Sequence, residues 1–556
     1  MQFRRSHAWM PSRREVMTAG ASAFALTTVS DFARPVANAR GTVFEGGSGA
    51  GPRRPGERGL PGVLISNGRD VVRTDPDGRW SLPVSEGDSV FVIKPPNWST
   101  PLGACALPSF SCLHQPRGSS AHLRYAGVAP TGALPVSIDF SLIRQEESPT
   151  FEAILISDTQ PENETELAYL RDDILVGMIG SGAAFAINQG DVVADDLSLY
   201  PRYLELLRAT SLKWHHCPGN HDLNLDAVGN GQARDTWKRT FGPPYYAFQH
   251  GQATFIVLDN VHYSGRSPYA PEGGCYAGRI GSAQLQFVRN LLAHVPPDHL
   301  IVVSMHIPLV ANQGDTAPGD YTADRRALLA LLSHRPHTLS LSGHMHTTEH
   351  HYLGPESGFA GSRPHHHHVL TAASGSWWCG PRDRRGIPSA DSVDGTPNGF
   401  HVLSVDGNHY TTRFVPAAGK GPAQIRVVVT SRCSNGGAAA RTSEARPPIA
   451  ASRLRDCAVV ANVFDGGPNT RVTCDVAGWG PHAMQRVAER DPFLLQVLSR
   501  QDAVRKPWVE PVPSTHLWSA PFPARLPAGA HRLTVTAIDE YGRRHIGHAV
   551  IEVAAG

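Results

Sequence analysis

The segment HTLSLSGHMH, His337–His346, sets the expectation for the fold, because it joins a strand-like run to a cluster of potential metal ligands. In an extended segment, residues two positions apart point to the same side, so His344 and His346 can reach one object. Imidazole is the commonest metal ligand in proteins. Histidine is plentiful here, at 28 of 556 residues, so an isolated pair is also typical of a polar surface. The segments upstream decide between these interpretations.

The same pattern recurs between residues 151 and 414. Short, mostly apolar runs, several of them closed by polar clusters, are FEAILISD, AAFAINQGD, LKWHHCPGNHD, ATFIVLDN, LIVVSMH and HTLSLSGHMH. Segments of helical character lie between several of them: ETELAYLRDDILVGMIG, YPRYLELLRAT and SAQLQFVRNLLAHV. Alternating strands and helices predict an α/β fold of βα units packed around buried sheets. Polar clusters at strand ends are where α/β folds usually carry their sites.

Composition limits the size and the partners of the protein. A chain of 556 residues predicts two to four domains. Its 51 basic and 49 acidic residues nearly balance, so nothing indicates nucleic acid or an anionic membrane as a bulk partner. The 54 glycines and 45 prolines favour turns, and therefore much β structure.

Two regions predict small β-sandwich domains on either side of the α/β region. Between residues 42 and 143, the pairs Asn67-Gly68 and Asp77-Gly78 separate alternating or apolar runs, which is a hairpin signal. After the linker PAAGKGPAQ, strand-like runs return without comparable helices. The predicted domains are residues 40–148 for the first sandwich, 149–417 for the α/β domain and 424–556 for the second sandwich.

The N-terminal 39 residues predict a targeting segment. Arg13 and Arg14 precede a modest apolar run from Ala19 to Val29, and Ala37-Asn38-Ala39 offers a small-x-small cleavage site. The run is too short and too mild to span a bilayer, so no transmembrane segment is expected. The arrangement resembles a twin-arginine signal, which implies the twin-arginine export machinery and a periplasmic or extracellular location. The alternative is a chance arginine pair in a basic tail.

Eight cysteines are compatible with disulfides in an exported protein. Cys105 and Cys112 lie close enough in one loop to pair, but the remaining connectivity does not follow from the sequence. None has C-x-x-C spacing, which argues against a zinc ribbon or a thioredoxin-type site.

The polar clusters, taken in order, resemble the calcineurin-like metallophosphoesterase family. The clusters are Asp158-Thr159-Gln160, Gly190-Asp191, Gly219-Asn220-His221-Asp222, His306 and Gly343-His344-Met345-His346. The family pattern is D-x-[H/Q], GD, GNH[D/E], H and GHxH, and the resemblance covers about residues 150–415. It implies a four-layer α/β/β/α core, flanked here by the two β-sandwich domains, as in exported bacterial members.

The resemblance also implies a reaction and a site. Two divalent ions about 3.5–4 Å apart clamp a phosphoryl group and generate hydroxide near neutral pH, so the expected substrates are phosphomonoesters or phosphodiesters. Mixed imidazole, carboxylate and amide ligands suit Mn, Fe or Zn. By motif position, one metal takes Asp158, Gln160, Asp191 and His346. The second takes Asp191, Asn220, His306 and His344.

His221 is expected to act as the general acid on the leaving group, a role that typically contributes about 10²–10⁴-fold in rate. Asp222 is expected either to orient or charge-stabilise that imidazole, or to cap a helix. Asp195 and Asp196 are interpreted as solvated turn acids, with a supporting role behind the ligands as the alternative.

Two departures from related patterns affect this expectation. Gln160 stands where histidine is commoner, and its amide oxygen is a weaker donor, so the first metal is expected to bind more loosely. Purple acid phosphatases place tyrosine three residues after the bridging aspartate, whereas Val192, Val193 and Ala194 follow Asp191 here. No tyrosinate–ferric site is expected.

The segment after the last ligands is rich in turns, tryptophan and arginine. Trp377 and Arg382, together with Trp378 and Arg384, are candidates for the substrate mouth because arginine suits phosphate recognition. Packing against the second sandwich is the alternative for the tryptophans. The run His365–His368 is interpreted as a strand that ends at the rim, with a third metal site as the less favoured alternative.

The functional prediction is therefore an exported dinuclear metal-dependent phosphoesterase. The alternative is a secreted envelope- or carbohydrate-binding protein whose central domain is not catalytic. A calcium-stabilised surface protein fits poorly, because calcium prefers oxygen ligands and this set carries three histidines. The natural substrate, the metal and the oligomeric state do not follow from the sequence.

Overall fold

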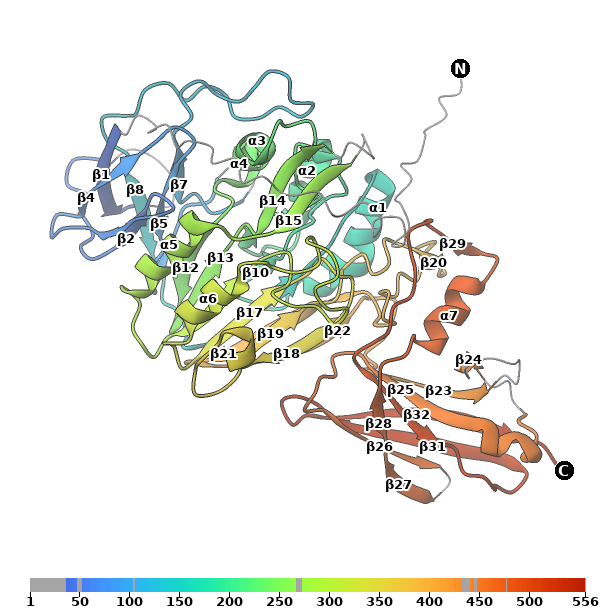
Figure 1. Cartoon of the computed structure of the whole chain (residues 1–556). Coiled ribbons are helices and arrows are strands. Elements are labelled where there is room, and N and C mark those ends of the chain that lie inside the picture. Colours follow the sequence, from blue (N-terminus) through green and yellow to red (C-terminus); the bar gives the residue numbers. More distant parts are fainter. Residues whose placement is uncertain are drawn as a thin grey trace, which may run out of the picture.

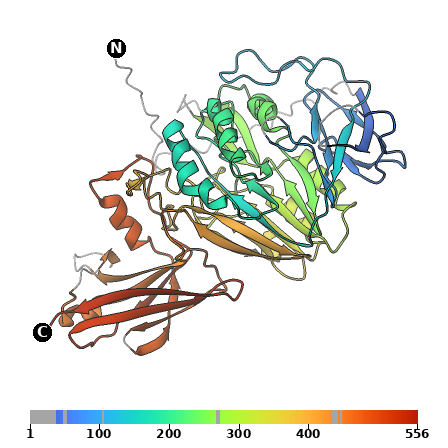
Figure 2. The same ribbon diagram turned by 180° about the vertical axis from the view of Figure 1, so that it is seen from behind.

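A computed structural model describes residues 37–47, 53–103, 106–266, 273–432, 441–444, 448–476 and 478–555 (Figure 1). The expected signal residues Arg13 and Arg14, and also Cys105, lie outside this range. The last residues of the predicted signal, Ala37–Ala39, begin the first strand. Among the described residues, no helix is long and apolar enough to cross a membrane. In both views the N-terminal and C-terminal β domains lie at opposite ends of the α/β domain (Figures 1 and 2).

The N-terminal domain consists of two four-stranded sheets, in the orders β4-β1-β8-β6 and β3-β2-β5-β7. Their strands are β1 (Ala37–Glu45), β2 (Leu64–Ser66), β3 (Val71–Arg73), β4 (Arg79–Val84), β5 (Ser89–Ile93), β6 (Trp98–Ser99), β7 (Ser111–Leu113) and β8 (Phe140–Arg144). The turn at Asn67-Gly68 joins the paired strands β2 and β3, as a hairpin does. The turn at Asp77-Gly78 leads instead into β4, which pairs with β1.

Two mixed sheets form the α/β domain. One has the order β11-β10-β9-β21-β22, and the other has the order β12-β13-β16-β17-β19-β18. The strands of the first are β9 (Thr150–Ile156), β10 (Phe185–Asn188), β11 (Trp214–His216), β21 (Gly399–Asp406) and β22 (His409–Pro416). Those of the second are β12 (Tyr246–His250), β13 (Ala253–Val257), β16 (Leu300–Ser304), β17 (Thr338–Ser342), β18 (Glu349–Leu353) and β19 (His365–Val369).

The helices and a hairpin connect these strands. The helices are α1 (Glu164–Tyr169), α2 (Tyr200–Arg208), α3 (Asn230–Ala233), α4 (Asp235–Phe241), α5 (Ser282–Leu292) and α6 (Arg325–Leu332). The hairpin is β14 (Val261–Arg266) with β15 (Gly274–Gly278). The Asn163 side chain caps α1 by accepting hydrogen bonds from the amides of Thr165 and Glu166. The helical path then continues through a π turn and a 3₁₀ turn to Met178.

The two faces of β9 show how the layers pack. Ala153 and Leu155 belong to one apolar cluster with the six-stranded sheet, α5 and α6. Ile154 and Ile156 belong to another with α1 and α2. Alternate residues of a strand point to opposite faces, so this sheet is buried on both sides, between helices and the second sheet. The predicted α/β class is confirmed.

The C-terminal domain has a five-stranded sheet, β24-β23-β25-β30-β28, and a four-stranded sheet, β27-β26-β31-β32. The strands are β23 (Ile425–Arg432), β24 (Arg441–Glu444), β25 (Cys457–Val463), β26 (Arg471–Val476), β27 (Trp479–Ala483), β28 (Gln485–Val487), β30 (Leu517–Pro521), β31 (Gly529–Ile538) and β32 (Arg544–Val553). The sequence did not predict its helix α7 (Pro492–Ser499), although Asp491 caps it and Pro492 occupies its first position.

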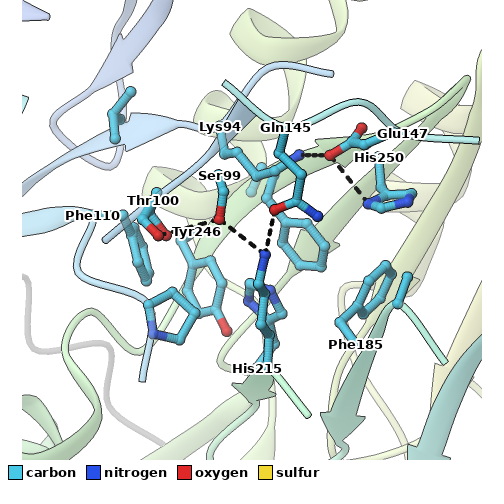
Figure 3. Close-up of a pocket in the computed structure, with 16 residues that line it drawn as sticks. Lys94, Ser99, Thr100, Phe110, Gln145, Glu147, Phe185, His215, Tyr246 and His250 are labelled. Atoms are coloured by element: carbon cyan, nitrogen blue, oxygen red, sulfur yellow. Dashed lines mark hydrogen bonds and ion pairs between the residues drawn. The ribbon is translucent and has the colours of Figure 1, made fainter. Parts of the chain in front are cut away.

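Polar side chains line a pocket between the N-terminal and α/β domains (Figure 3). The Lys94 ammonium lies 2.5 Å from Glu147, which also lies 3.3 Å from His250 Nδ1. Nearby, Lys213 donates hydrogen bonds to Ser99 and Gln145. Because the Glu147 side chain is only 1% exposed, these partners compensate for burying its charge.

Candidate metal centre

The predicted ligands follow five strands whose carboxyl ends meet. Asp158, Asp191 and Asn220 come after β9, β10 and β11, which are parallel neighbours. His306 and the pair His344 and His346 come after β16 and β17, which are parallel neighbours in the other sheet. Side chains at the carboxyl ends of parallel strands gather at one edge, so the two sheets together supply one site.

The backbone of this site is strained. Asp158, Gln160, Asp191, His344 and His346 all have positive φ, between 34° and 74°. Non-glycine residues seldom adopt this conformation, and each instance costs about 1–3 kcal/mol. Backbone hydrogen bonds between the loops hold it, for example from the Asp158 amide to the Gly190 carbonyl and from the Gln160 amide to the Asp191 carbonyl, both 3.1 Å. Strain that is concentrated in one place indicates a functional site.

The glycines of the motifs leave room for the carboxylates. A Cβ atom at Gly219 would lie 2.1 Å from Asp191 Oδ1, and one at Gly343 would lie 2.3 Å from Asp158 Oδ2. Both distances are far shorter than any van der Waals contact. Glycine is therefore required at these positions so that the loops can approach each other closely.

Hydrogen bonds fix the orientation of His306. Its Nδ1 lies 2.9 Å from the Gln189 carbonyl oxygen, which can only accept, so Nδ1 carries a proton. In the neutral ring, Nε2 then presents a lone pair. That atom lies 2.9 Å from Asn220 Oδ1, 3.2 Å from Asp191 Oδ2 and 3.2 Å from His344 Nδ1. Electron-pair donors that converge in this way require a cation between them, either a proton on Nε2 or a metal ion.

His346 is oriented in the same way. Its Nδ1 donates to the Gly375 carbonyl oxygen at 2.5 Å, so in the neutral ring Nε2 presents its lone pair to Asp158 Oδ1, 3.7 Å away. Burial lowers the pKa of His346, which favours the neutral ring. A carbonyl that holds the far nitrogen is the usual outer partner of a metal-binding histidine.

Gln160 and Asp191 complete the set. The Gln160 amide donates from Nε2 to Asp191 Oδ2 at 3.0 Å. Its Oε1 is buried and has no hydrogen-bond partner among the described residues. Burial by itself raises the pKa of Asp191, but the neighbouring His306 and His221 outweigh it and lower that pKa below the usual range. An ionised carboxylate and an unpaired amide oxygen fit the donor set of a metal centre.

The contacts of His221 differ from those expected from the sequence. Its Nδ1 lies 2.9 Å from Asp195 Oδ1, and its Nε2 lies 4.0 Å from Asp191 Oδ2. Asp195, interpreted from sequence mainly as a turn acid, is thus the residue that orients the ring, and its own φ is 63°. The ring is 27% exposed, so it can reach a substrate.

Asp222 mainly serves the backbone, and its charge also helps to raise the pKa of His221. Its carboxylate accepts hydrogen bonds from the amides of Gly219 and Val192 and from the Tyr200 hydroxyl, at 2.8–3.2 Å. It lies in a bend where no helix begins, so the helix-cap alternative also fails. Asp222 thereby holds the loops of Asp191 and Asn220 together.

The candidates for the substrate mouth occupy different places. Trp377 stacks on His346, with ring centroids 3.7 Å apart and planes inclined by 19°. Arg382 lies further out, where its guanidinium donates to the Tyr169 hydroxyl at 2.6 Å. Trp378 is buried and packs on Tyr169 in an apolar cluster of the α/β domain, and not against the second sandwich as the alternative expected.

Two neighbours of the site were not anticipated from sequence. Tyr276 of β15 lies edge-on to His344, with ring centroids 6.1 Å apart. The C-terminal domain also approaches this side of the molecule, since β20 (Gly380–Pro381) pairs with β29 (Ala503–Val504). Next to it, Lys506 forms an ion pair of 2.7 Å with Glu162. No sequence signal marked these long-range contacts.

Two family models match the chain. One, described as calcineurin-like phosphoesterase, matches residues 152–348, and the other, described as C terminal of calcineurin-like phosphoesterase, matches residues 367–545. The protein is a metal-dependent phosphoester hydrolase. It belongs to the calcineurin-like phosphoesterases, which confirms the resemblance found in the sequence.

Other comparisons add a distant likeness. None of the curated proteins matches the chain. A purple acid phosphatase isolated from yellow lupin (Lupinus luteus) seeds matches over 64% of this chain and 67% of its own, with 12% sequence identity and a TM-score of 0.35.

Proposed function

We propose that the protein is an exported phosphoesterase with two metal ions, which hydrolyses phosphomonoesters or phosphodiesters. The observation that carries this proposal is the convergence of Asn220 Oδ1 and Asp191 Oδ2 on His306 Nε2, at 2.9 Å and 3.2 Å, while a carbonyl holds the opposite nitrogen of His306. A lone pair among acceptor oxygens is a binding site for a cation.

The ligand sets are those given by motif position. The first ion is held by Asp158, Gln160, Asp191 and His346, and the second by Asp191, Asn220, His306 and His344. Mn, Fe and Zn all suit such mixed donors. Bound there, two divalent ions supply a nucleophile near neutral pH and neutralise charge on the phosphoryl oxygens.

The chain itself supplies the proton for the leaving group. His221 follows the ligand Asn220, is partly exposed, and has one ring nitrogen held by Asp195. The other nitrogen is then free to protonate a leaving oxygen. This supports hydrolysis over a non-catalytic binding role, because a binding protein has no use for an oriented acid beside a cation site.

Hydrolysis is tested with the metal-loaded protein. A panel of phosphomonoesters and phosphodiesters is assayed with Mn, Fe or Zn, beside the variant Asp191→Asn. We expect the metal-loaded protein to hydrolyse at least one ester class and the variant to lose this activity. Binding of envelope polymers or carbohydrates without turnover of any ester would favour the non-catalytic alternative.

Export rests on the sequence of the first 39 residues, in particular on Arg13 and Arg14. The double substitution Arg13→Lys, Arg14→Lys is expected to leave the precursor inside the cell while the folded enzyme stays active. Cell fractionation with an activity assay measures this. Normal export of the variant would point to the general secretory route.

A further inference from the structure

A second group of buried histidines lies where the α/β domain meets the C-terminal domain. His350 comes from β18, His368 from β19 and His401 from β21, so both sheets contribute. Asp465, just after β25, comes from the C-terminal domain. All three imidazoles are at most 3% exposed. None of these residues belongs to the metal centre described above.

The three imidazoles converge on a single oxygen. Their Nε2 atoms lie 3.1 Å (His350), 3.2 Å (His368) and 3.3 Å (His401) from Asp465 Oδ1. Ligands at about 2.0–2.1 Å from a tetrahedral zinc ion lie about 3.3 Å from one another. The four atoms thus already have nitrogen–oxygen separations close to those of a zinc coordination sphere.

Hydrogen bonding alone does not satisfy this group. Only the Nε2 atoms of His350 and His401 have the geometry to donate a hydrogen bond to Asp465 Oδ1, and two such bonds would use both lone pairs of that oxygen. His368 Nε2 is left without a hydrogen bond within the part of the chain that the structure describes, although it is fully buried. A buried polar atom of this kind calls for an explanation such as an ion.

The outer contacts of His350 suit a metal ligand. His350 Nδ1 lies 2.9 Å from His366 Nε2, and His366 Nδ1 lies 2.9 Å from the Tyr410 hydroxyl. If each Nδ1 carries the proton, this series of hydrogen bonds leaves His350 Nε2 unprotonated, with its lone pair facing Asp465.

We propose that His368, His401 and Asp465, with His350 as the fourth ligand, bind a divalent ion of the zinc class that fastens the C-terminal domain to both sheets. The ligand atoms of the first three lie within 4.8 Å of one another. The His350 ring stacks on the His368 ring with centroids 4.0 Å apart. To share the ion, the His350 ring must turn slightly out of this stack. Four protein ligands leave no open position for water, which distinguishes structural from catalytic zinc sites.

Metal analysis of two matched variants tests this site. His367 is the control, because it is as buried as His368 in the same strand but bonds to Ser340 and the Leu309 amide. The full-length protein, His368→Gln and His367→Gln are equilibrated with zinc, freed of excess metal and analysed by mass spectrometry. His368→Gln is expected to hold one equivalent less than the other two. Equal metal content in all three would overturn the proposal.

Crystals of the wild-type chain equilibrated with zinc provide a test that needs no variant. An anomalous difference map at the zinc edge is expected to show a peak bounded by His368, His401 and Asp465. The lack of a peak there overturns the proposal, whether or not the first centre is occupied. Conversely, a peak there without peaks at Asp191 would support this site and contradict the proposed dinuclear centre, so the two failures are distinguishable.

Discussion

The Nδ1 atom of His221 lies 2.9 Å from Oδ1 of Asp195, and the two residues follow neighbouring strands of one sheet. The carboxylate fixes the ring so that Nε2 faces the side where Asp191 lies. Burial by itself lowers the pKa of His221, but Asp195 and Asp191 outweigh it and raise that pKa to about 10. The charge of Asp195, which is not a proposed metal ligand, thus favours the protonated ring, which is the state that a general acid requires.

Removal of His221 is expected to affect chemistry and not metal binding. His221→Ala should lose about 10²–10⁴-fold in turnover on substrates with poor leaving groups, the usual contribution of a general acid. With a nitrophenolate leaving group, which needs little protonation, the loss should be much smaller. Metal content and turnover are measured on both substrates. Equal losses on both, with the metals retained, would reduce His221 to a residue that positions the substrate.

Removal of the Asp195 charge should change the pH profile. Asp195→Asn lowers the pKa of His221, because a group that raised it is gone. The acid form is lost as pH rises through that pKa, so the alkaline limb of the turnover profile should move to lower pH. Asp196→Asn is the matched control, since Asp196 instead binds the amide and hydroxyl of Ser198. An unmoved limb in Asp195→Asn would refute the orienting role.

The close approach at Gly343 gives a steric prediction. A Cβ atom there would also lie 1.6 Å from Ser157 Oγ, so Gly343→Ala must displace the loop that carries His344 and His346. We expect loss of metal and of activity. Gly231→Ala is the control, because a Cβ atom at Gly231 meets nothing within 4 Å. Normal metal content in Gly343→Ala would contradict the proposed ligand geometry.

The domain interface of Figure 3 predicts a pH dependence of stability. Burial alone raises the pKa of Glu147, but His250 and Lys94 outweigh it and lower it from 4.5 to about 2. The carboxylate thus contributes about 3 kcal/mol above pH 4.5, and this contribution is lost as pH falls from 4.5 towards 2.

Unfolding by urea at several pH values measures this contribution. Glu147→Gln should be less stable than the wild type at pH 7, and the difference should shrink below pH 4.5. Glu146→Gln is the control, since Glu146 is exposed. A difference that stays constant down to pH 3 would show that the charge of Glu147 is not involved.

The sequence pattern was sufficient to predict the fold class and to predict that the candidate ligands lie together. Both follow from local order: apolar runs such as LIVVSMH became strands, and their polar ends met because parallel strands end at one edge. The helix α7 could not be predicted because the surrounding sequence favours strands, and only Asp491 and Pro492 mark its start.

Contacts between distant segments could not be predicted. The expected partner of His221 was its neighbour Asp222, whereas the chain path brings Asp195 to the ring from the loop after β10. The run His365–His368 is a strand, as expected, but it is buried along its length and does not end at a rim. Its link to Asp465 spans two domains, so no local pattern could reveal it.

The metal content of the full-length protein, compared with that of Asp191→Asn, tests the central proposal most directly. Asp191 is proposed to hold both ions, so its substitution should remove two equivalents of metal relative to the wild type, together with phosphoesterase activity. The ion proposed at Asp465 would remain in both proteins, and the difference between them is unaffected by it. Retention of the wild-type metal content and activity in Asp191→Asn would contradict the dinuclear centre.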